Sequence, residues 1–159
     1  MFAKNLVSLI SEGKRILNID ETLINNLFFP RRKWRQHGSV QSTANKIVNP
    51  RVSLIAALDT EGDVYLSVTQ VNTDSDVMRL YLSRLAMQLD FERPDWRKST
   101  VFMLDNASYH KKILGHLKEL KIQVIFTGPY SYDAAPCELL FAQLKTNNLN
   151  PSGLQTGKK

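Results

Sequence analysis

Three carboxylates stand where a protein could use them to hold metal ions. Asp20 and Asp105 each end a short apolar run, at residues 15–20 and 101–105, and Glu138 opens a short amphipathic segment. Acidic groups at strand ends cost free energy unless a ligand uses them. Hard divalent cations such as magnesium prefer oxygen ligands, and two ions about 4 Å apart would use these three side chains.

The composition is that of one ordinary globular domain. The chain has 159 residues, enough for a sizeable core, and a net charge of +6 that favours a polyanion such as nucleic acid as partner. Its single cysteine, Cys137, excludes an intrachain disulfide and fits a reducing compartment. No apolar run approaches about 18 residues, and we identify no secretory signal, so we expect a protein that is neither secreted nor embedded in a membrane.

The hydrophobic pattern predicts an α/β fold. Strands are expected over residues 15–20, 52–58, 64–70, 101–105 and 122–126, and helices over about 1–13, 74–89, 108–120 and 137–144. A hairpin followed by alternating strands and helices predicts one mixed five-stranded sheet flanked by helices, with the last two strands parallel. We expect loops over 21–50 and 90–99, and divide the chain into an extension (1–14), one domain (15–146) and a flexible tail (147–159).

This arrangement brings the carboxylates toward one edge. Functional groups gather at the carboxyl ends of strands in such sheets, which is where Asp20 and Asp105 lie. The apolar arc of the last helix must face the sheet, so Glu138 and Lys145 project together on another arc. A metal-binding carboxylate beside a phosphate-binding lysine is chemically sensible.

Each residue also has a simpler reading. An aspartate at a strand end is more often a cap or turn residue than a ligand, and Asn106 could also be a turn residue. Glu138 could simply favour the amino terminus of a helix. The three carboxylates together, in this order of strands, are much less expected by chance, but the residues alone leave the metal site and these simpler explanations about equally favoured.

Three segments resemble the catalytic domain of mariner-type DDE transposases. They are Ile19-Asp20-Glu21-Thr22, residues 102–110 (FMLDNASYH) and residues 128–138 (GPYSYDAAPCE). That family commonly carries Asp-Glu on its first strand, Asp-Asn-Ala-x-x-His after its fourth, and Pro-Pro-Tyr-Ser-Pro-Asp-x-Asn-Pro-x-Glu before its last helix. Thirty-two residues separate Asp105 and Glu138, close to the usual family spacing.

The resemblance implies an RNase H-like fold and a metal-dependent DNA-cleaving and strand-transferring enzyme. Asp20, Asp105 and Glu138 would bind two Mg²⁺ ions, with Mn²⁺ as a substitute, for in-line attack on a phosphodiester. The implied partners are DNA, namely transposon ends and target, and a second copy of the chain. No nucleotide cofactor is expected, and there is no phosphate-binding glycine loop. The implied location is the nucleus in a eukaryote and otherwise the cytoplasm.

The third segment departs from the family pattern at Gly128, Tyr132 and Ala135. The family's amino-terminal helix-turn-helix region also has no counterpart in these 159 residues, so we expect a fragment or a degenerate copy. These departures keep open a catalytically silent, transposase-derived DNA-binding or protein-interaction module. Another nuclease of the same fold, against which the third segment argues, and a basic α/β domain of unrelated function are the remaining alternatives.

Other residues are candidates for binding and support. The run Arg31-Arg32-Lys33-Trp34-Arg35 could grip phosphates and stack on a base. It could equally be a solvated basic loop, or contact a partner subunit as in mariner-type enzymes. Asn106 and His110 could contact the metal ligands, and not the metal, and hold them in place. For His110, a histidine on the helix surface is an equally good explanation.

Overall fold

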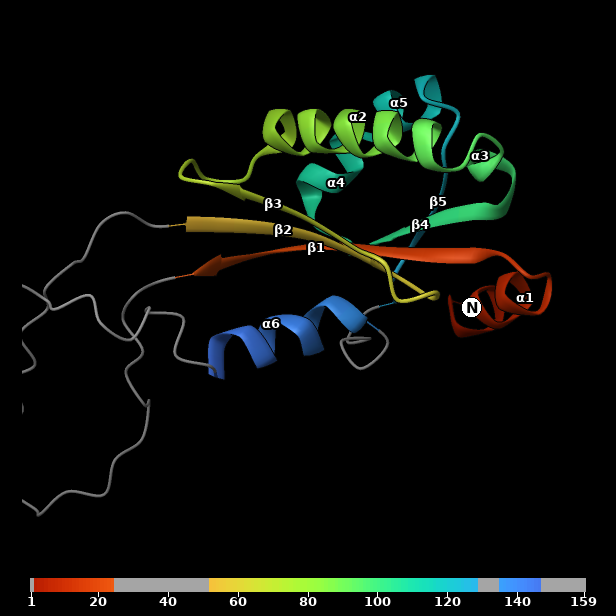
Figure 1. The fold of residues 1–159 in the computed structure, drawn as a ribbon, viewed down its shortest axis with the longest axis horizontal. Helices are drawn as coiled ribbons and strands as arrows, with labels where there is room; N and C mark the ends of the chain where they lie inside the picture. Colours follow the sequence, from red (N-terminus) through yellow and green to blue (C-terminus); the bar gives the residue numbers. More distant parts are fainter. Residues whose placement is uncertain (1, 25–51, 129–134, 147–159) are drawn as a thin grey trace, which may run out of the picture.

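A central sheet with helices on both faces forms the fold of the computed structural model, which describes residues 2–24, 52–128 and 135–146 (Figure 1). The strands are β1 (Arg15–Ile24), β2 (Val52–Asp59), β3 (Val64–Thr69), β4 (Thr100–Leu104) and β5 (Gln123–Phe126). The helices are α1 (Phe2–Ser11), α2 (Ser75–Glu92), α3 (Trp96–Ser99), α4 (Ser108–Lys112), α5 (Leu114–Glu119) and α6 (Pro136–Thr146). Among these helices, none has the length and apolar character needed to cross a membrane.

The five strands lie in the order β3-β2-β1-β4-β5, which confirms the predicted mixed sheet. β1 pairs antiparallel with β2, and β2 with β3, so the hairpin occupies one side of the sheet. β4 pairs parallel with β1 and with β5, as helical connections require. β1 is therefore the central strand and the boundary between the antiparallel and parallel halves.

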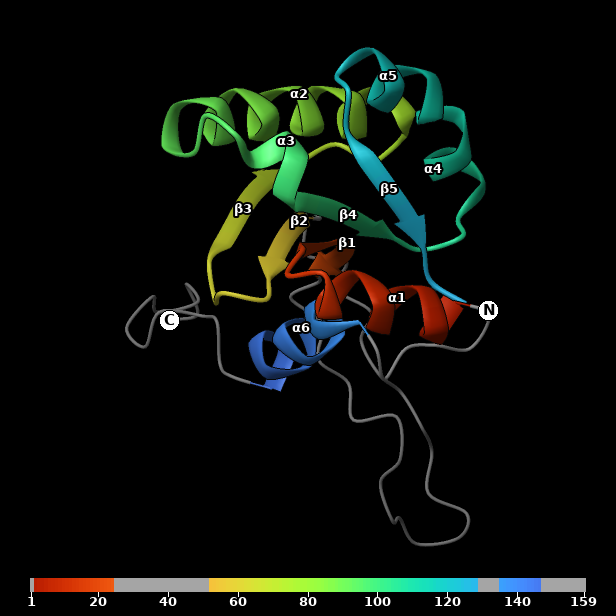
Figure 2. The same cartoon turned by 90° about the vertical axis from the view of Figure 1, so that its right-hand side faces the viewer.

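Alternating side chains divide the core into two faces. On one face, Leu17, Ile19 and Phe102 pack with the buried side of α2 and with α5. On the other face, Cys137 and Phe141 of α6 pack on β2, while α1 packs on β1 and β4. Figure 2 shows α1 and α6 on the same side of the sheet, opposite α2, α4 and α5. The predicted apolar arc of the last helix is confirmed, because Phe141 is buried and Leu140 and Leu144 pack against the same cluster.

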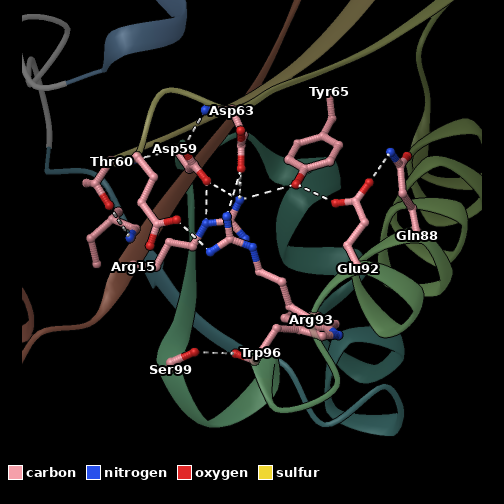
Figure 3. A network of polar contacts seen from close by, with 12 residues as sticks. Arg15, Asp59, Thr60, Asp63, Tyr65, Gln88, Glu92, Arg93, Trp96 and Ser99 are labelled. Carbon is pink, nitrogen blue, oxygen red and sulfur yellow. Dashed lines mark hydrogen bonds and ion pairs between the residues drawn. The ribbon is translucent and has the colours of Figure 1, made fainter.

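A buried ion pair joins the start of β1 to the end of β2. The Arg15 guanidinium contacts the Asp59 carboxylate, and both side chains are almost fully buried. Arg15 Nη2 also donates to Asp63 Oδ2 at 3.1 Å and to the Tyr65 hydroxyl at 3.2 Å. The Tyr65 hydroxyl in turn donates to Glu92 Oε2 at 3.0 Å, so the network reaches α2 (Figure 3).

β1 is longer than the sequence predicted. It was expected to end at Asp20, but its pairing with β2 continues to the pair Ile24 and Val52. The parallel pairing with β4, in contrast, ends at the pair Asn18 and Met103. The polar residues after Asp20 can remain in a strand because β2 supplies hydrogen-bonding partners for their backbone.

The expected single helix over 108–120 is wrong. The chain breaks at Ile113, whose backbone has φ −90° and ψ 0°, so α4 and α5 are separate short helices. Gly115 lowers the helix propensity of the segment by about 1 kcal/mol relative to alanine, and this makes the break inexpensive. Ile113 itself is fully buried, so core packing fixes the site of the break.

The segment 90–99, expected as a loop, contains regular structure. α2 continues to Glu92, and α3 begins at Trp96, whose ring is buried and stacks on Phe102 with centroids 5.5 Å apart. The indole nitrogen donates to Asp90 Oδ1 at 2.8 Å. Asp74 caps the amino terminus of α2, since its side chain accepts from the backbone amides of Asp76 and Val77.

Replacing Asp59 with asparagine should destabilise the fold strongly, because it leaves the Arg15 guanidinium buried without its closest counter-charge. We expect a loss of about 3 kcal/mol in the free energy of unfolding, measured by denaturant titration. Asp95→Asn is the matched control, since its ion pair with Lys98 is exposed and should contribute little. Equal stability of the two variants would contradict a structural role for the buried pair.

Candidate active site

Asp20 and Asp105 reach the same edge of the sheet. The last pair of the parallel ladder between β1 and β4 is Asn18 with Met103, and the two aspartates follow this pair by two residues on each strand. Neighbouring strands lie about 4.8 Å apart, and residues two apart share a face. The Asp20 side chain is half-buried within β1, and Asp105 is exposed just after β4. The register therefore brings these carboxylates together although 84 residues separate them.

The start of α6 is fastened to the strand that carries Asp20. The Cys137 amide donates to Asn18 Oδ1 at 2.9 Å, and the Cys137 thiol donates to the Asn18 carbonyl at 3.1 Å. Asn18 and Asp20 share the face of β1 that α6 covers. Glu138 follows Cys137 directly, is exposed, and lies in the first turn of α6. Burial raises the pKa of the Cys137 thiol to about 12, which fits its predicted role as a small buried residue rather than a nucleophile.

The charge state of Asp20 reflects this neighbourhood. Burial raises the pKa of its carboxyl to about 7, and a hydrogen bond from the Glu21 amide at 2.8 Å offsets part of the rise. Repulsion from Glu21, Glu138 and Asp105 raises the pKa further. Burial is the largest cause of the raised pKa of Asp20. Asp20 thus experiences the charges of both other candidate ligands.

Asp105 is held by the helix that follows it. Its Oδ1 accepts from the Ala107 amide at 2.9 Å and contacts His110 Nδ1 at 2.5 Å. His110 is fully buried, so the reading as a surface histidine is wrong. Burial lowers the pKa of its imidazole, but Glu21 and Asp105 together outweigh burial and leave the pKa raised. Within the described residues, no hydrogen bond to Asp105 Oδ2 is observed, which leaves this atom available to a ligand.

Asn106 supports the neighbouring strand end. Its side-chain amide donates to the carbonyl of Thr127, just beyond β5, and the Thr127 amide donates to the Leu104 carbonyl at 2.8 Å. These two bonds join the end of β5 to the end of β4. Asn106 therefore fixes the loop that carries Asp105, which agrees with the supporting role predicted for it.

A second acidic cluster lies at the opposite end of β1. Asp59, Glu61 and Asp63 are the one group of three in the described part of the chain whose ligand atoms all lie within 4.8 Å of one another. Arg15 and Arg93 already neutralise them; Arg93 contacts Glu61 at 2.5 Å and Asp63 at 3.0 Å. We therefore assign this cluster to the hairpin rather than to a cation.

The three predicted ligands are less tightly grouped than that cluster. Asp20, Asp105 and Glu138 would hold divalent ions through carboxylate oxygens, and the ions would supply Lewis-acid chemistry to a phosphodiester. The donor set fits such ions, since it offers only carboxylate oxygens and includes one half-buried carboxyl whose charge a cation would stabilise. The site residues nevertheless remain a prediction.

The predicted DNA contacts lie outside the residues whose side chains the structure describes. Residues 31–35 are not described, and Lys145 is described only as part of the α6 backbone. The structure adds cations that sequence reasoning missed, because Lys111 and Lys112 are exposed on α4, directly after His110. Their place in the predicted helix after Asp105, six and seven residues past it, was the available signal.

Comparison with known proteins places the chain in a family. Residues 15–158 match the model of the DDE superfamily endonucleases, nearly the whole chain. No curated protein is significantly similar to it in sequence. The fold resembles that of the Mos1 mariner paired end complex with Mn, with a TM-score of 0.68 and 22% identity over 90% of this chain and 46% of the other.

Two further structures share the fold. The Mos1 strand transfer complex has a TM-score of 0.65 and 23% identity, over 91% of this chain and 45% of the other. A simian T-cell lymphotropic virus intasome has a TM-score of 0.57 and 16% identity, over 84% of this chain and 39% of the other. The chain thus spans about half the length of the Mos1 chains, and it has the predicted RNase H-like fold. By its sequence match over residues 15–158, the chain belongs to the DDE superfamily endonucleases.

Proposed function

We propose that this chain is the catalytic part of a mariner-like transposase that cleaves DNA and transfers the cut strand. The observation that carries the proposal is the position of Asp20, a half-buried carboxyl on the central strand β1. Like Asp105 on the neighbouring strand, it follows the pair Asn18 and Met103 by two residues, and it shares the face of β1 to which Cys137 anchors α6. A family of endonucleases provides the chemical context. Two divalent ions would activate the attacking water or 3′-hydroxyl and stabilise the leaving oxygen.

Each of the three carboxylates would hold the ions in its own way. Asp20 would be the shared ligand, because it stands between the other two carboxylates in its electrostatic interactions. Asp105 would offer Oδ2, since Oδ1 is occupied by Ala107 and His110. Glu138 would approach from α6, whose first turn is anchored to β1 through Cys137 and Asn18.

The proposed partners are DNA and a second copy of the chain. The matched Mos1 structures are a pre-cleavage transpososome, paired end complexes and a strand transfer complex, and two of the paired end complexes are described as complexes with Mn or Mg. By analogy we propose transposon ends and target DNA as substrates, and Mg²⁺ or Mn²⁺ as the ions. The activity of a whole transposase is part of this proposal, because the chain spans about half of those chains.

A silent, transposase-derived binding module is the second candidate. The observation that favours it is the departure from the family pattern at Gly128, Tyr132 and Ala135, which lie in the segment that leads to Glu138. Such a module would bind DNA or protein without using magnesium. The metal and cleavage measurements below separate the two candidates.

The Asp20 carboxyl of the proposed metal site should make the stability of the metal-free protein depend on pH. Because the folded state raises the pKa of Asp20 to about 7 from an ordinary value near 3.8, its protonated form favours folding. That contribution is complete below about pH 4 and is lost as the pH rises through 7. Asp20→Asn should remove this part of the pH dependence of the melting temperature, whereas Asp76→Asn on α2 should keep it.

Magnesium should reverse this loss. The ion binds deprotonated carboxylates, so it should stabilise the wild type more at pH 8 than at pH 6. At ten times its dissociation constant it should add about 1.4 kcal/mol, followed as a shift in melting temperature. An equal shift at both pH values, or an undiminished shift in Asp20→Asn, would refute the proposed site. No shift in the wild type would favour the silent module.

Cleavage should depend on the same residues. With Mg²⁺ or Mn²⁺ the protein should nick or join DNA, and a chelator should stop the reaction. Asp105→Asn should reduce nicking to the chelated background without unfolding the protein, because Asp105 is exposed and the change keeps its shape. Asp95→Asn, an exposed residue at the start of α3, is the control and should retain wild-type activity. Undiminished nicking by Asp105→Asn would remove Asp105 from the mechanism.

DNA binding should be weak and insensitive to sequence, because phosphate contacts position a duplex without reading it. We expect affinity on the order of micromolar or weaker at physiological salt, with each phosphate-bound cation adding about one unit to the slope of log affinity against log salt. Alanine replacements in the predicted basic run should flatten this slope. The replaced residues are Arg31, Arg32, Lys33 and Arg35.

The measurement is a salt series on two unrelated duplexes. Lys111→Ala with Lys112→Ala tests the α4 cations beside Asp105 in the same way. Lys4→Ala with Arg84→Ala removes two exposed cations on α1 and α2 and serves as the matched control. Tight, salt-insensitive binding to one duplex would contradict the proposed phosphate contacts.

A further inference from the structure

His110 lies between two carboxylates that come from neighbouring strands. Its Nδ1 contacts Asp105 Oδ1 at 2.5 Å, and its Nε2 lies 3.6 Å from Glu21 Oε2. The imidazole is completely buried, whereas the Asp105 side chain is half exposed. The three side chains therefore form a chain that runs from inside the protein to the edge of the candidate active site.

Glu21 and Asp20 are adjacent in β1 but serve different faces of the sheet. Successive residues of a strand alternate between its faces, so Asp20 faces α6 while Glu21 faces α4 and its His110. Sequence reasoning used Glu21 only as part of a motif. The structure gives it a separate contact on the face that carries no candidate ligand.

The contact between Glu21 and His110 has no substitute. Glu21 Oε2 and His110 Nε2 are both buried, and within the described residues neither has a hydrogen-bond partner. A buried polar atom without a partner costs free energy, so Glu21 Oε2 and His110 Nε2 stabilise each other only while the ring keeps this orientation. The same orientation presents Nδ1 to Asp105.

Resting on the proposed function, we propose that Glu21 and His110 are positioning residues that fix the carboxylate of Asp105 for metal binding. Glu21 sets the rotation of the His110 ring, and the ring together with the Ala107 amide holds Asp105 Oδ1. This would leave Asp105 Oδ2, for which no hydrogen bond from the described residues is observed, to bind an ion. Residues that orient metal ligands in this way commonly change affinity by about 10- to 100-fold.

Amide substitutions can separate the two contacts of the ring. The side-chain nitrogen of asparagine occupies roughly the place of Nδ1, and that of glutamine the place of Nε2. His110→Asn should thus retain the bond to Asp105, while His110→Gln should lose it. Glu21→Gln keeps the size of the side chain and removes its charge, so it weakens the outer contact without creating a cavity.

The probe is Mn²⁺, titrated into the full chain and followed by electron paramagnetic resonance. His110→Gln should weaken Mn²⁺ binding by about 10- to 100-fold, Glu21→Gln by about 10-fold, and His110→Asn least of the three. In nicking assays kcat should fall in the same order, while KM for DNA stays unchanged. A purely structural role would instead lower melting temperature without this order in Mn²⁺ affinity.

His116→Gln is the matched control. His116 also contacts a hydroxyl and a carboxylate, Ser83 at 2.9 Å and Glu119 at 3.7 Å, but it lies on α5 and touches no candidate ligand. It should bind Mn²⁺ like the wild type. Wild-type affinity in both His110→Gln and Glu21→Gln would overturn the positioning role alone. A wild-type protein that binds no Mn²⁺ would overturn the proposed function and this inference with it.

Discussion

The register of β1 is the constraint on which the rest of the structure depends. This strand contributes Arg15 to the buried ion pair, Asn18 to the anchor of α6, and Asp20 to the candidate site. Shifting a strand by one residue moves every side chain to the other face. Such a slip would bury Asp20 under α2 and direct Glu21 at α6. The Arg15–Asp59 pair opposes this slip, because it forms only when the start of β1 lies beside the end of β2 in the observed register.

The candidate site is built from elements whose backbones have little freedom. Asp20 lies within a strand paired on both sides, and Asp105 lies one residue beyond another strand. Asn106 and Thr127 join the ends of two parallel strands, so the loop after β4 is held from its far side. Glu138 is exposed in the first turn of α6, which the hydrogen bonds of Cys137 join to Asn18 of β1. All three candidate residues are therefore held by strands or by a helix joined to a strand.

Local pattern and the resemblance together predicted most of the fold from sequence. The alternation of apolar residues located the five strands, and the hairpin turn and helical connections gave their directions. The apolar sequence pattern did not predict the local structure where tertiary contacts determine it. Nothing local marks the break at Ile113, and Trp96 sits among charged residues that suggest a loop. His110 has helical spacing with Ile113 and Leu117, which is a core signal, but a histidine is rarely counted among core residues.

The alternation of β1 has a consequence for how Asp20 and Glu21 can be studied. A sheet isolates the two faces of one strand, so the backbone of adjacent residues is shared while their surroundings are not. The Glu21 side chain contacts His110 on one face, while its charge still raises the pKa of its neighbour Asp20 on the other. Effects of changing Glu21 and His110 should be strongly non-additive, since removing either one already destroys their contact. Side-chain contacts of this strand thus follow the faces of the sheet, whereas its charge interactions also act along the chain.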